Sequence, residues 1–149
     1  MQAEELSVFL HVGMTVSNIE KTIEFYTTHF GFKAIRRGTF SDEFIGALPQ
    51  LYEQPEGTYA DFAFLSSPDN VVFELFQFSN SQQKDHLSWN KPGYHHICIK
   101  VKSVRQTCER LVAQGVEFFF APRVKGDPKN NEYWVFLKDP DGNMIELQD

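Results

Sequence analysis

The chain has 149 residues, 42% of them hydrophobic and 23% charged, which suits one globular domain or two small modules that share a core. Its net charge of −6 and its pI near 5.3 argue against nucleic acid or an anionic membrane as a partner. No apolar run approaches the roughly 20 residues that cross a bilayer, and the N-terminus lacks a signal-peptide pattern, so a cytoplasmic protein is expected. Two cysteines in unrelated contexts, Cys98 and Cys108, are expected to be reduced thiols.

The first half of the chain predicts a strand, a helix and three further strands. Residues 7–16 are rich in β-branched and aromatic side chains, which indicates a strand. Residues 17–32 have apolar side chains at helical spacing, with Ser17 or Asn18 able to cap the helix and Gly31 placed to end it. The later strands are expected at 32–40, 59–67 and 70–78.

The second half repeats this order. An offset of 85 residues superposes His11 on His96 and Val16 on Val101. A strand is expected at 96–101, and helical spacing follows in residues that end at a glycine. The helix and the last three strands of this half are expected at 102–115, 116–122, 132–139 and 143–148.

The last strands of the two halves are also alike: PDNVVFEL at 68–75 matches PDGNMIEL at 140–147, each with a glutamate just before leucine. The sequence therefore predicts an α+β fold of two βαβββ modules within a single domain. The modules are expected at about 7–79 and 93–149, joined by the polar stretch between them. An insert at 41–57 occurs only in the first half, and part of it can form a short helix.

Histidine and glutamate occupy unusual places in these apolar strands. Side chains alternate along a strand, so His11 shares a face with Thr15, and His96 lies at the equivalent place of the second module. Glu74 and Glu146 lie between apolar neighbours, where a carboxylate is costly to bury unless it is paired or coordinated. The four side chains together predict one divalent metal ion at the pseudo-twofold axis. Nitrogen and oxygen ligands suit Zn, Ni, Co, Mn or Fe better than Ca or Mg.

Each of these residues alone also has a simpler interpretation. A single histidine in an apolar strand is more often a hydrogen-bonded core residue than a ligand, and His95 is expected to be only a neighbour of the site. The glutamates can equally be surface residues of edge strands. Their repetition as a set of four favours the metal.

The stretch FLHVGMTVSNIEKTIEFYTTHFGF and the ending DPDGNMIEL resemble the vicinal-oxygen-chelate superfamily, also called the glyoxalase, bleomycin-resistance and dioxygenase group. The resemblance covers nearly the whole chain. It implies paired βαβββ modules whose strands form an incomplete mixed β-barrel around a metal. The family's ligands fall on His11, Glu74, His96 and Glu146.

For such a ligand set the resemblance implies a metal-dependent lyase or isomerase of the glyoxalase I or methylmalonyl-CoA epimerase type. A small oxygen-chelating substrate would lose a proton beside its polarised carbonyl, pass through an enediolate and regain the proton from a carboxylate. Glu146 or Glu74 could carry that proton. Asp61 is a further candidate, although an outward-facing strand position explains it as well.

The substrate pocket is expected to combine Thr15 with aromatic side chains, namely Phe64, Phe76, Phe78 and Trp134. Bacterial glyoxalase I usually has an arginine and an asparagine, both contacting glutathione, at the places of Thr15 and Phe78. The chain departs from that pattern, so an uncharged or aromatic substrate would suit it equally.

Two other classes compete with this interpretation. An Fe(II) ring-cleaving dioxygenase would use two histidines and only one carboxylate, so a fourth protein ligand argues against it. A non-catalytic antibiotic-binding protein would normally lack the ligand set. Exposed strand edges predict a homodimer that acts on a small molecule.

Overall fold

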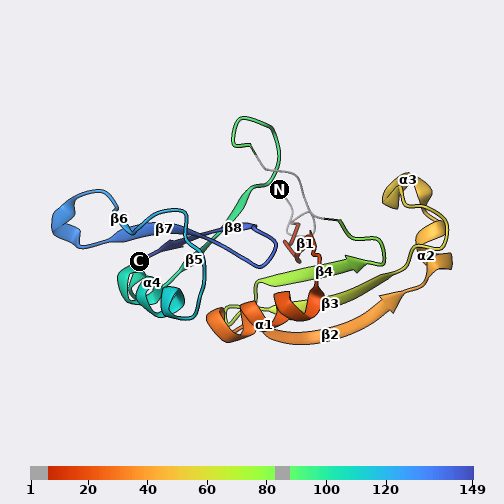
Figure 1. The fold of residues 1–149 in the computed structure, drawn as a ribbon, viewed down its shortest axis with the longest axis horizontal. Coiled ribbons are helices and arrows are strands. Elements are labelled where there is room, and N and C mark those ends of the chain that lie inside the picture. Colours follow the sequence, from red (N-terminus) through yellow and green to blue (C-terminus); the bar gives the residue numbers. More distant parts are fainter. Residues whose placement is uncertain (1–6, 83–87) are drawn as a thin grey trace. The chain divides into compact units, whose positions relative to one another are not determined.

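The structure, a computed structural model, describes residues 7–82 and 88–149 (Figure 1). It divides into two compact units, with the division between Gln83 and Lys84. Each unit contains an open four-stranded sheet and a helix of ten or more residues. The predicted α+β fold with two βαβββ units is confirmed. None of the helices in these two stretches is both long enough and apolar enough to span a membrane.

The sheet of the first unit has the strand order β1-β4-β3-β2. Strand β1 runs parallel to β4, and the other neighbours are antiparallel. The elements in chain order are β1 (Val12–Thr15), α1 (Ile19–Phe30), β2 (Lys33–Phe40), α2 (Asp42–Gly46), α3 (Pro49–Tyr52), β3 (Ala60–Ser66) and β4 (Val72–Phe78).

The second unit repeats this topology, with the strand order β5-β8-β7-β6 and β5 parallel to β8. The β6–β7 and β7–β8 pairs are antiparallel. The elements are β5 (His96–Lys100), α4 (Val104–Ala113), β6 (Arg123–Val124), the 3-10 turn η2 (Pro128–Asn130), β7 (Tyr133–Lys138) and β8 (Met144–Gln148).

Helix α1 begins and ends where the sequence predicts. The Asn18 side chain accepts a hydrogen bond from the Lys21 backbone N–H, and Gly31 adopts φ of 70° just after the last turn. The Gly31 N–H donates to the Tyr26 carbonyl, so the helix ends with a paired backbone group. Tyr26 itself is fully buried and anchors the helix in the core.

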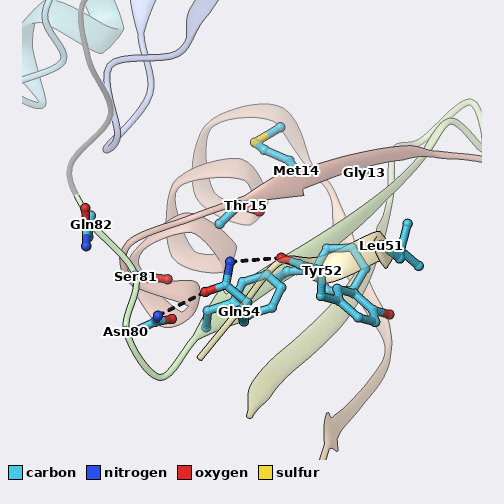
Figure 2. A pocket seen from close by; sticks show the side chains of 11 residues that line it. Gly13, Met14, Thr15, Leu51, Tyr52, Gln54, Asn80, Ser81 and Gln82 are labelled. Carbon is cyan, nitrogen blue, oxygen red and sulfur yellow. Dashed lines mark hydrogen bonds between the residues drawn. The ribbon is translucent and has the colours of Figure 1, made fainter. Parts of the chain in front are cut away.

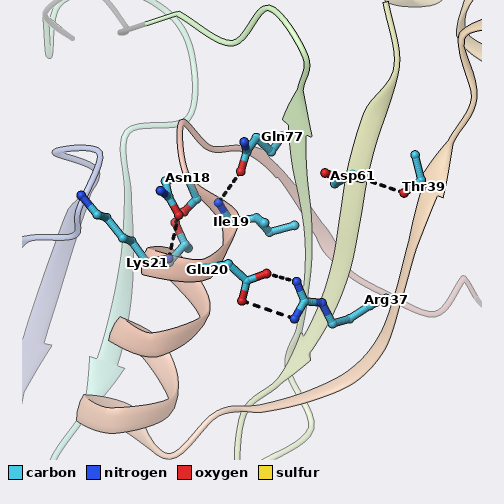
Figure 3. Close-up of polar contacts among 9 residues, drawn as sticks. Asn18, Ile19, Glu20, Lys21, Arg37, Thr39, Asp61 and Gln77 are labelled. Carbon is cyan, nitrogen blue, oxygen red and sulfur yellow. Dashed lines mark hydrogen bonds and ion pairs between the residues drawn. The ribbon is translucent and has the colours of Figure 1, made fainter.

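Each main helix is fixed to its sheet by the residue three positions after the module's glutamate. In the first unit, Gln77 Oε1 accepts from the Ile19 N–H at 2.7 Å (Figure 3). In the second, Asp149 Oδ2 accepts from the Val104 N–H, also at 2.7 Å. Both contacts satisfy a donor that the first turn of a helix leaves unpaired. The two units therefore share a helix anchor as well as a strand order.

The two faces of the first sheet differ. Residues that alternate with the glutamate point toward α1 and are buried, as Ala63, Leu65 and Leu75 are. The opposite face carries Glu74 and a row of phenylalanines that are only partly buried. In the second unit, Ile145 and Leu147 are buried, and Glu146 points to the other face. Both glutamates therefore lie on the face of their sheet that is opposite to the buried core.

Three sequence predictions need correction. Strand β1 covers only Val12–Thr15, because residues 8–10 are exposed and unpaired in a sheet. The strand expected at 116–122 is reduced to a single bridge between Phe118 and Leu137, and regular pairing occurs only at Arg123–Val124. Pro122 has no N–H to donate, which interrupts the ladder there. The insert holds two short helices, α2 and α3, where one was expected.

Gly38 on β2 lies directly under an aromatic ring. A Cβ atom there would lie 2.6 Å from the Phe62 ring, which stacks on Phe40 with centroids 4.6 Å apart. We expect Gly38→Ala to lower the free energy of unfolding by about 1–3 kcal/mol, because the ring has to move out of its packed position. Chemical denaturation would measure the change.

Gly46, at the end of α2, is the matched control, since a Cβ there would meet nothing within 4 Å. Gly46→Ala is expected to change the unfolding free energy by less than about 0.5 kcal/mol. Equal effects of the two substitutions would contradict the packing of Phe62 over Gly38.

Candidate functional site

The first unit brings together the histidine and the glutamate that the sequence singles out. Glu74 lies beside Gly13 in the parallel pairing of β4 with β1, and His11 is two residues before Gly13 on the same face. His11 Nε2 lies 2.9 Å from Glu74 Oε2. The histidine side chain is 38% exposed and the glutamate side chain 17%. The Phe64 ring packs edge-on against His11, with centroids 5.8 Å apart. The pair is therefore walled by an aromatic ring and still open to solvent.

The second unit holds an equivalent pair. His96 Nε2 on β5 lies 3.4 Å from Glu146 Oε2 on β8, and the carboxylate is 15% exposed. Gln148 adds a contact that the first unit lacks. Its Nε2 donates to Glu146 Oε1 at 2.7 Å, whereas the equivalent place in β4 holds Phe76, which has no donor. One glutamate is thus held by a hydrogen bond, and the other has an aromatic neighbour.

His95 is more than a sequence neighbour of His96. The Nδ1 atoms of the two rings are 2.8 Å apart, and the rings are stacked with centroids 4.9 Å apart. Trp89 covers His95 at a centroid distance of 4.0 Å. If His96 Nδ1 donates the hydrogen in this contact and His95 Nδ1 accepts it, the Nε2 of His96 has a free lone pair and can coordinate. Apart from the adjacency of the two histidines, nothing in the sequence predicts this contact.

The separation of the donor atoms fits a shared cation. Two ligand atoms that each lie about 2.1 Å from one metal ion are roughly 3.0–3.4 Å apart. The two pairs have separations of 2.9 Å and 3.4 Å. One neutral imidazole nitrogen with one carboxylate oxygen is also the donor mixture that suits a first-row divalent metal.

Each unit by itself supplies two such donors. Within the described residues, no group of three or more histidine, cysteine, aspartate or glutamate side chains is positioned to hold a metal ion. Cys98 lies beside Glu146 in the strand pairing but is a poor ligand, because burial and the Glu146 carboxylate raise the pKa of its thiol. Cys98 and Cys108 are both free.

Asp61 lies on the other side of the sheet from Glu74. It pairs with Gln77 in the β3–β4 ladder, whereas Phe64 pairs with Glu74, and odd and even positions of a strand face opposite ways. Its carboxylate accepts a hydrogen bond from the Thr39 hydroxyl at 2.7 Å. The structure therefore does not bring Asp61 together with Glu74. Asp61 is polar because it faces solvent and Thr39 on the side that carries α1.

The predicted pocket residues separate into two groups. Thr15, Phe76 and Phe78 line an open cavity in the first unit, whereas Phe64 lies beside His11. Trp134 belongs to the second unit, where it packs against Phe120 and Phe136 and pairs with Gln148 in the ladder. The sequence did not indicate the polar members of the cavity lining, because they come from the insert and from the segment after β4: Gln54, Asn80, Ser81 and Gln82.

A sequence model of the Glyoxalase/Bleomycin resistance protein/Dioxygenase superfamily matches residues 8–147. The chain belongs to this superfamily. The match covers both units, in keeping with the duplicated strand order and the repeated histidine and glutamate positions. The relationship predicted from the sequence is thereby confirmed.

Relatives within the superfamily include enzymes. A lactoylglutathione lyase from Pseudomonas putida is 29% identical over 148 residues, which cover 94% of this chain and 83% of that protein. A probable lactoylglutathione lyase from Vibrio cholerae is 31% identical over 140 residues, covering 93% and 87%. The crystal structure of a glyoxalase family protein from Bacillus cereus shares the fold with a TM-score of 0.78 and 21% identity, covering 99% of this chain and 97% of that one.

Proposed function

We propose that the chain is a metal-dependent lyase or isomerase of the glyoxalase I type that transfers a proton within a small oxygen-chelating substrate. The observation that carries this proposal is the repeated histidine–glutamate pair, found at equivalent strand positions of both units with donor separations that fit a cation. The relatives named lactoylglutathione lyase support the same class of reaction.

The proposed ligands of one divalent ion, Zn, Ni, Co, Mn or Fe, are His11, Glu74, His96 and Glu146. When bound, the ion would polarise the substrate carbonyl and stabilise the enediolate that proton removal produces. The imidazoles would bind through Nε2, the atom that each pair directs toward its carboxylate. His95 would hold His96 in the tautomer that permits this.

The carboxylates would carry the proton. Glu146 is held by the Gln148 amide at 2.7 Å, which fixes its orientation. The corresponding neighbour of Glu74 is Phe76, so Glu74 has no such restraint from its own strand. We assign proton removal to Glu74 and return of the proton, or removal from the opposite side, to Glu146. The phenylalanines on this face, Phe64 among them, would limit the access of water to the reacting carbon.

Proton exchange in heavy water tests this function directly. The metal-loaded protein should catalyse exchange of the proton beside the carbonyl in at least one of three substrate types: a glutathione hemithioacetal, an acyl thioester or a hydroxy-ketone. Nuclear magnetic resonance would follow the loss of the proton signal, and the chelator-treated protein is the control. Oxygen consumption without exchange would instead support a ring-cleaving dioxygenase. Absence of both with every substrate type and metal would contradict the proposal.

A homodimer remains part of the proposal. The apolar side chains of Val8, Phe9 and Leu10 are 78%, 78% and 72% exposed, a surface that a second copy could cover.

A further inference from the structure

The first unit contains an open cavity of about 610 Å³ on the same side of the sheet as Glu74 (Figure 2). Strands β1 and β4 form its floor, helix α3 and the residue Gln54 form one wall, and the segment after β4 forms the other. Its volume is that of a site for a small molecule. The lining includes Thr15, Tyr52, Gln54, Phe76, Phe78 and Asn80.

The cavity begins one strand step beyond the histidine–glutamate pair, and neither His11 nor Glu74 belongs to its lining. Gly13 is the next residue after His11 on this face of the chain, and Phe76 is the next after Glu74. Each such step along a strand covers about 7 Å. A substrate whose reacting end lies at His11 and Glu74 would therefore have its remaining atoms over Gly13 and in the cavity.

The polar groups of the lining are neutral. Within the described residues, the lining includes no charged side chain. Gln54 is at the centre of a chain of amide contacts: its Nε2 donates to the Tyr52 carbonyl at 3.0 Å, and its Oε1 accepts from Asn80 Nδ2 at 2.9 Å (Figure 2). An amide has more donors and acceptors than these contacts use, so Asn80 can still offer its Oδ1 to a ligand. Thr15 adds a hydroxyl on the floor.

Aromatic rings form the apolar part of the cavity. Phe76 and Phe78 are stacked with centroids 6.4 Å apart, and Tyr52 closes over Phe78 at 6.1 Å. Two cations of β2, Lys33 and Arg36, are on this face, and neither is part of the lining. Arg36 lies over the rings of Phe62 and Phe64. A flat group could thus stack in the cavity, but an anionic group would lose its hydration there without meeting a positive charge.

We infer that the cavity binds an uncharged, flat group with an amide or hydroxyl function, so that the substrate is neutral at the end that enters it. The inference rests on the proposed function only for the reacting end of the substrate. A glutathione adduct, with its two carboxylates, does not match this lining. The neutral amide pair and the aromatic floor select instead an aromatic hydroxy-ketone or dicarbonyl whose distant end carries a hydrogen-bonding group.

Two nearly isosteric probes test the charge preference. 3-Phenylpropanamide and 3-phenylpropanoate differ only in a neutral amide against a carboxylate. Binding of each to the full-length, metal-free chain would be followed by amide shifts in nuclear magnetic resonance spectra. We expect the amide to bind at least about tenfold more tightly, with shifts at Thr15 and Asn80. Equal or tighter binding of the carboxylate, or no shift at these residues with either probe, would overturn the inference.

A charge placed in the cavity should invert the preference. Thr15→Arg adds a cation to the floor and is expected to favour the carboxylate by about tenfold. Thr28→Arg, at an exposed position of α1, adds the same charge outside the cavity and should leave the preference for the amide unchanged. The same response from both variants would show that net charge rather than the cavity decides, and would overturn the inference.

These measurements need no metal and no turnover. A chain that binds metal and exchanges substrate protons but does not discriminate between the probes would retain the proposed function and lose the inference. If the chain discriminates between the probes but binds no metal, the inference about the cavity is retained and the proposed function is contradicted.

Discussion

Glutamine in place of Glu74 should lower turnover by about 10²- to 10⁴-fold, the range that a positioned general base contributes. Glutamine keeps the size of the side chain and loses its ability to accept a proton, so the packing against Phe64 is retained. Glu146→Gln should reduce turnover by at least about 100-fold as well, because the proton then has no acceptor on the second carboxylate. Rates of proton exchange and of product formation, measured at saturating metal, would give both values.

Asp61→Asn is the matched control for these variants. It makes the same change from acid to amide in the same sheet, but on the face that carries α1 and opposite to Glu74. Its turnover should stay within about threefold of the original chain. A loss of turnover comparable to that of Glu74→Gln would show that Asp61 takes part in the reaction. It would contradict the conclusion that only the face that carries Glu74 does so.

Under the proposed ligand set, replacing either histidine should weaken metal binding. His11→Ala and His96→Ala are each expected to weaken metal affinity by at least about 100-fold, since even an outer partner of a ligand is worth 10- to 100-fold. The two histidines belong to different units, so equal losses would indicate one shared ion. Titration with a divalent metal, together with metal analysis of the purified chain, would measure affinity and stoichiometry.

His29→Gln provides the control for this experiment. His29 lies near the end of α1, where its ring packs against Phe25 with centroids 5.0 Å apart. Its replacement should leave the metal affinity unchanged. Binding of two ions per chain, or full affinity in His96→Ala, would contradict a single site shared by the two pairs.

The parts of the fold predicted correctly are those where a local pattern is strong. The spacing of apolar residues and the caps at Asn18 and Gly31 determined α1, and the repeat at an offset of 85 residues revealed the duplication. The strand expected at 116–122 failed because three phenylalanines look like a strand, while Pro122 and the packing of Phe120 on Trp134 oppose the pairing. Tertiary context outweighs β propensity in such a stretch.

The two pairs of the candidate site could be predicted because both members of each pair recur in the repeat. The composition around Asp61 does not reveal which face of the strand this residue is on, whereas its register with Gln77 does. Gln148 could have been found, since it is two residues after Glu146 on the same face. The contact between Gln54 and Asn80 could not, because it depends on how the insert returns to the sheet.

The difference between Gln148 and Phe76 has a consequence for the product. Under the proposed function, one of the two proton acceptors is restrained by a hydrogen bond and the other is not. Glu74 and Glu146 should then transfer the proton at unequal rates, and one enantiomer of a chiral substrate should react faster than the other.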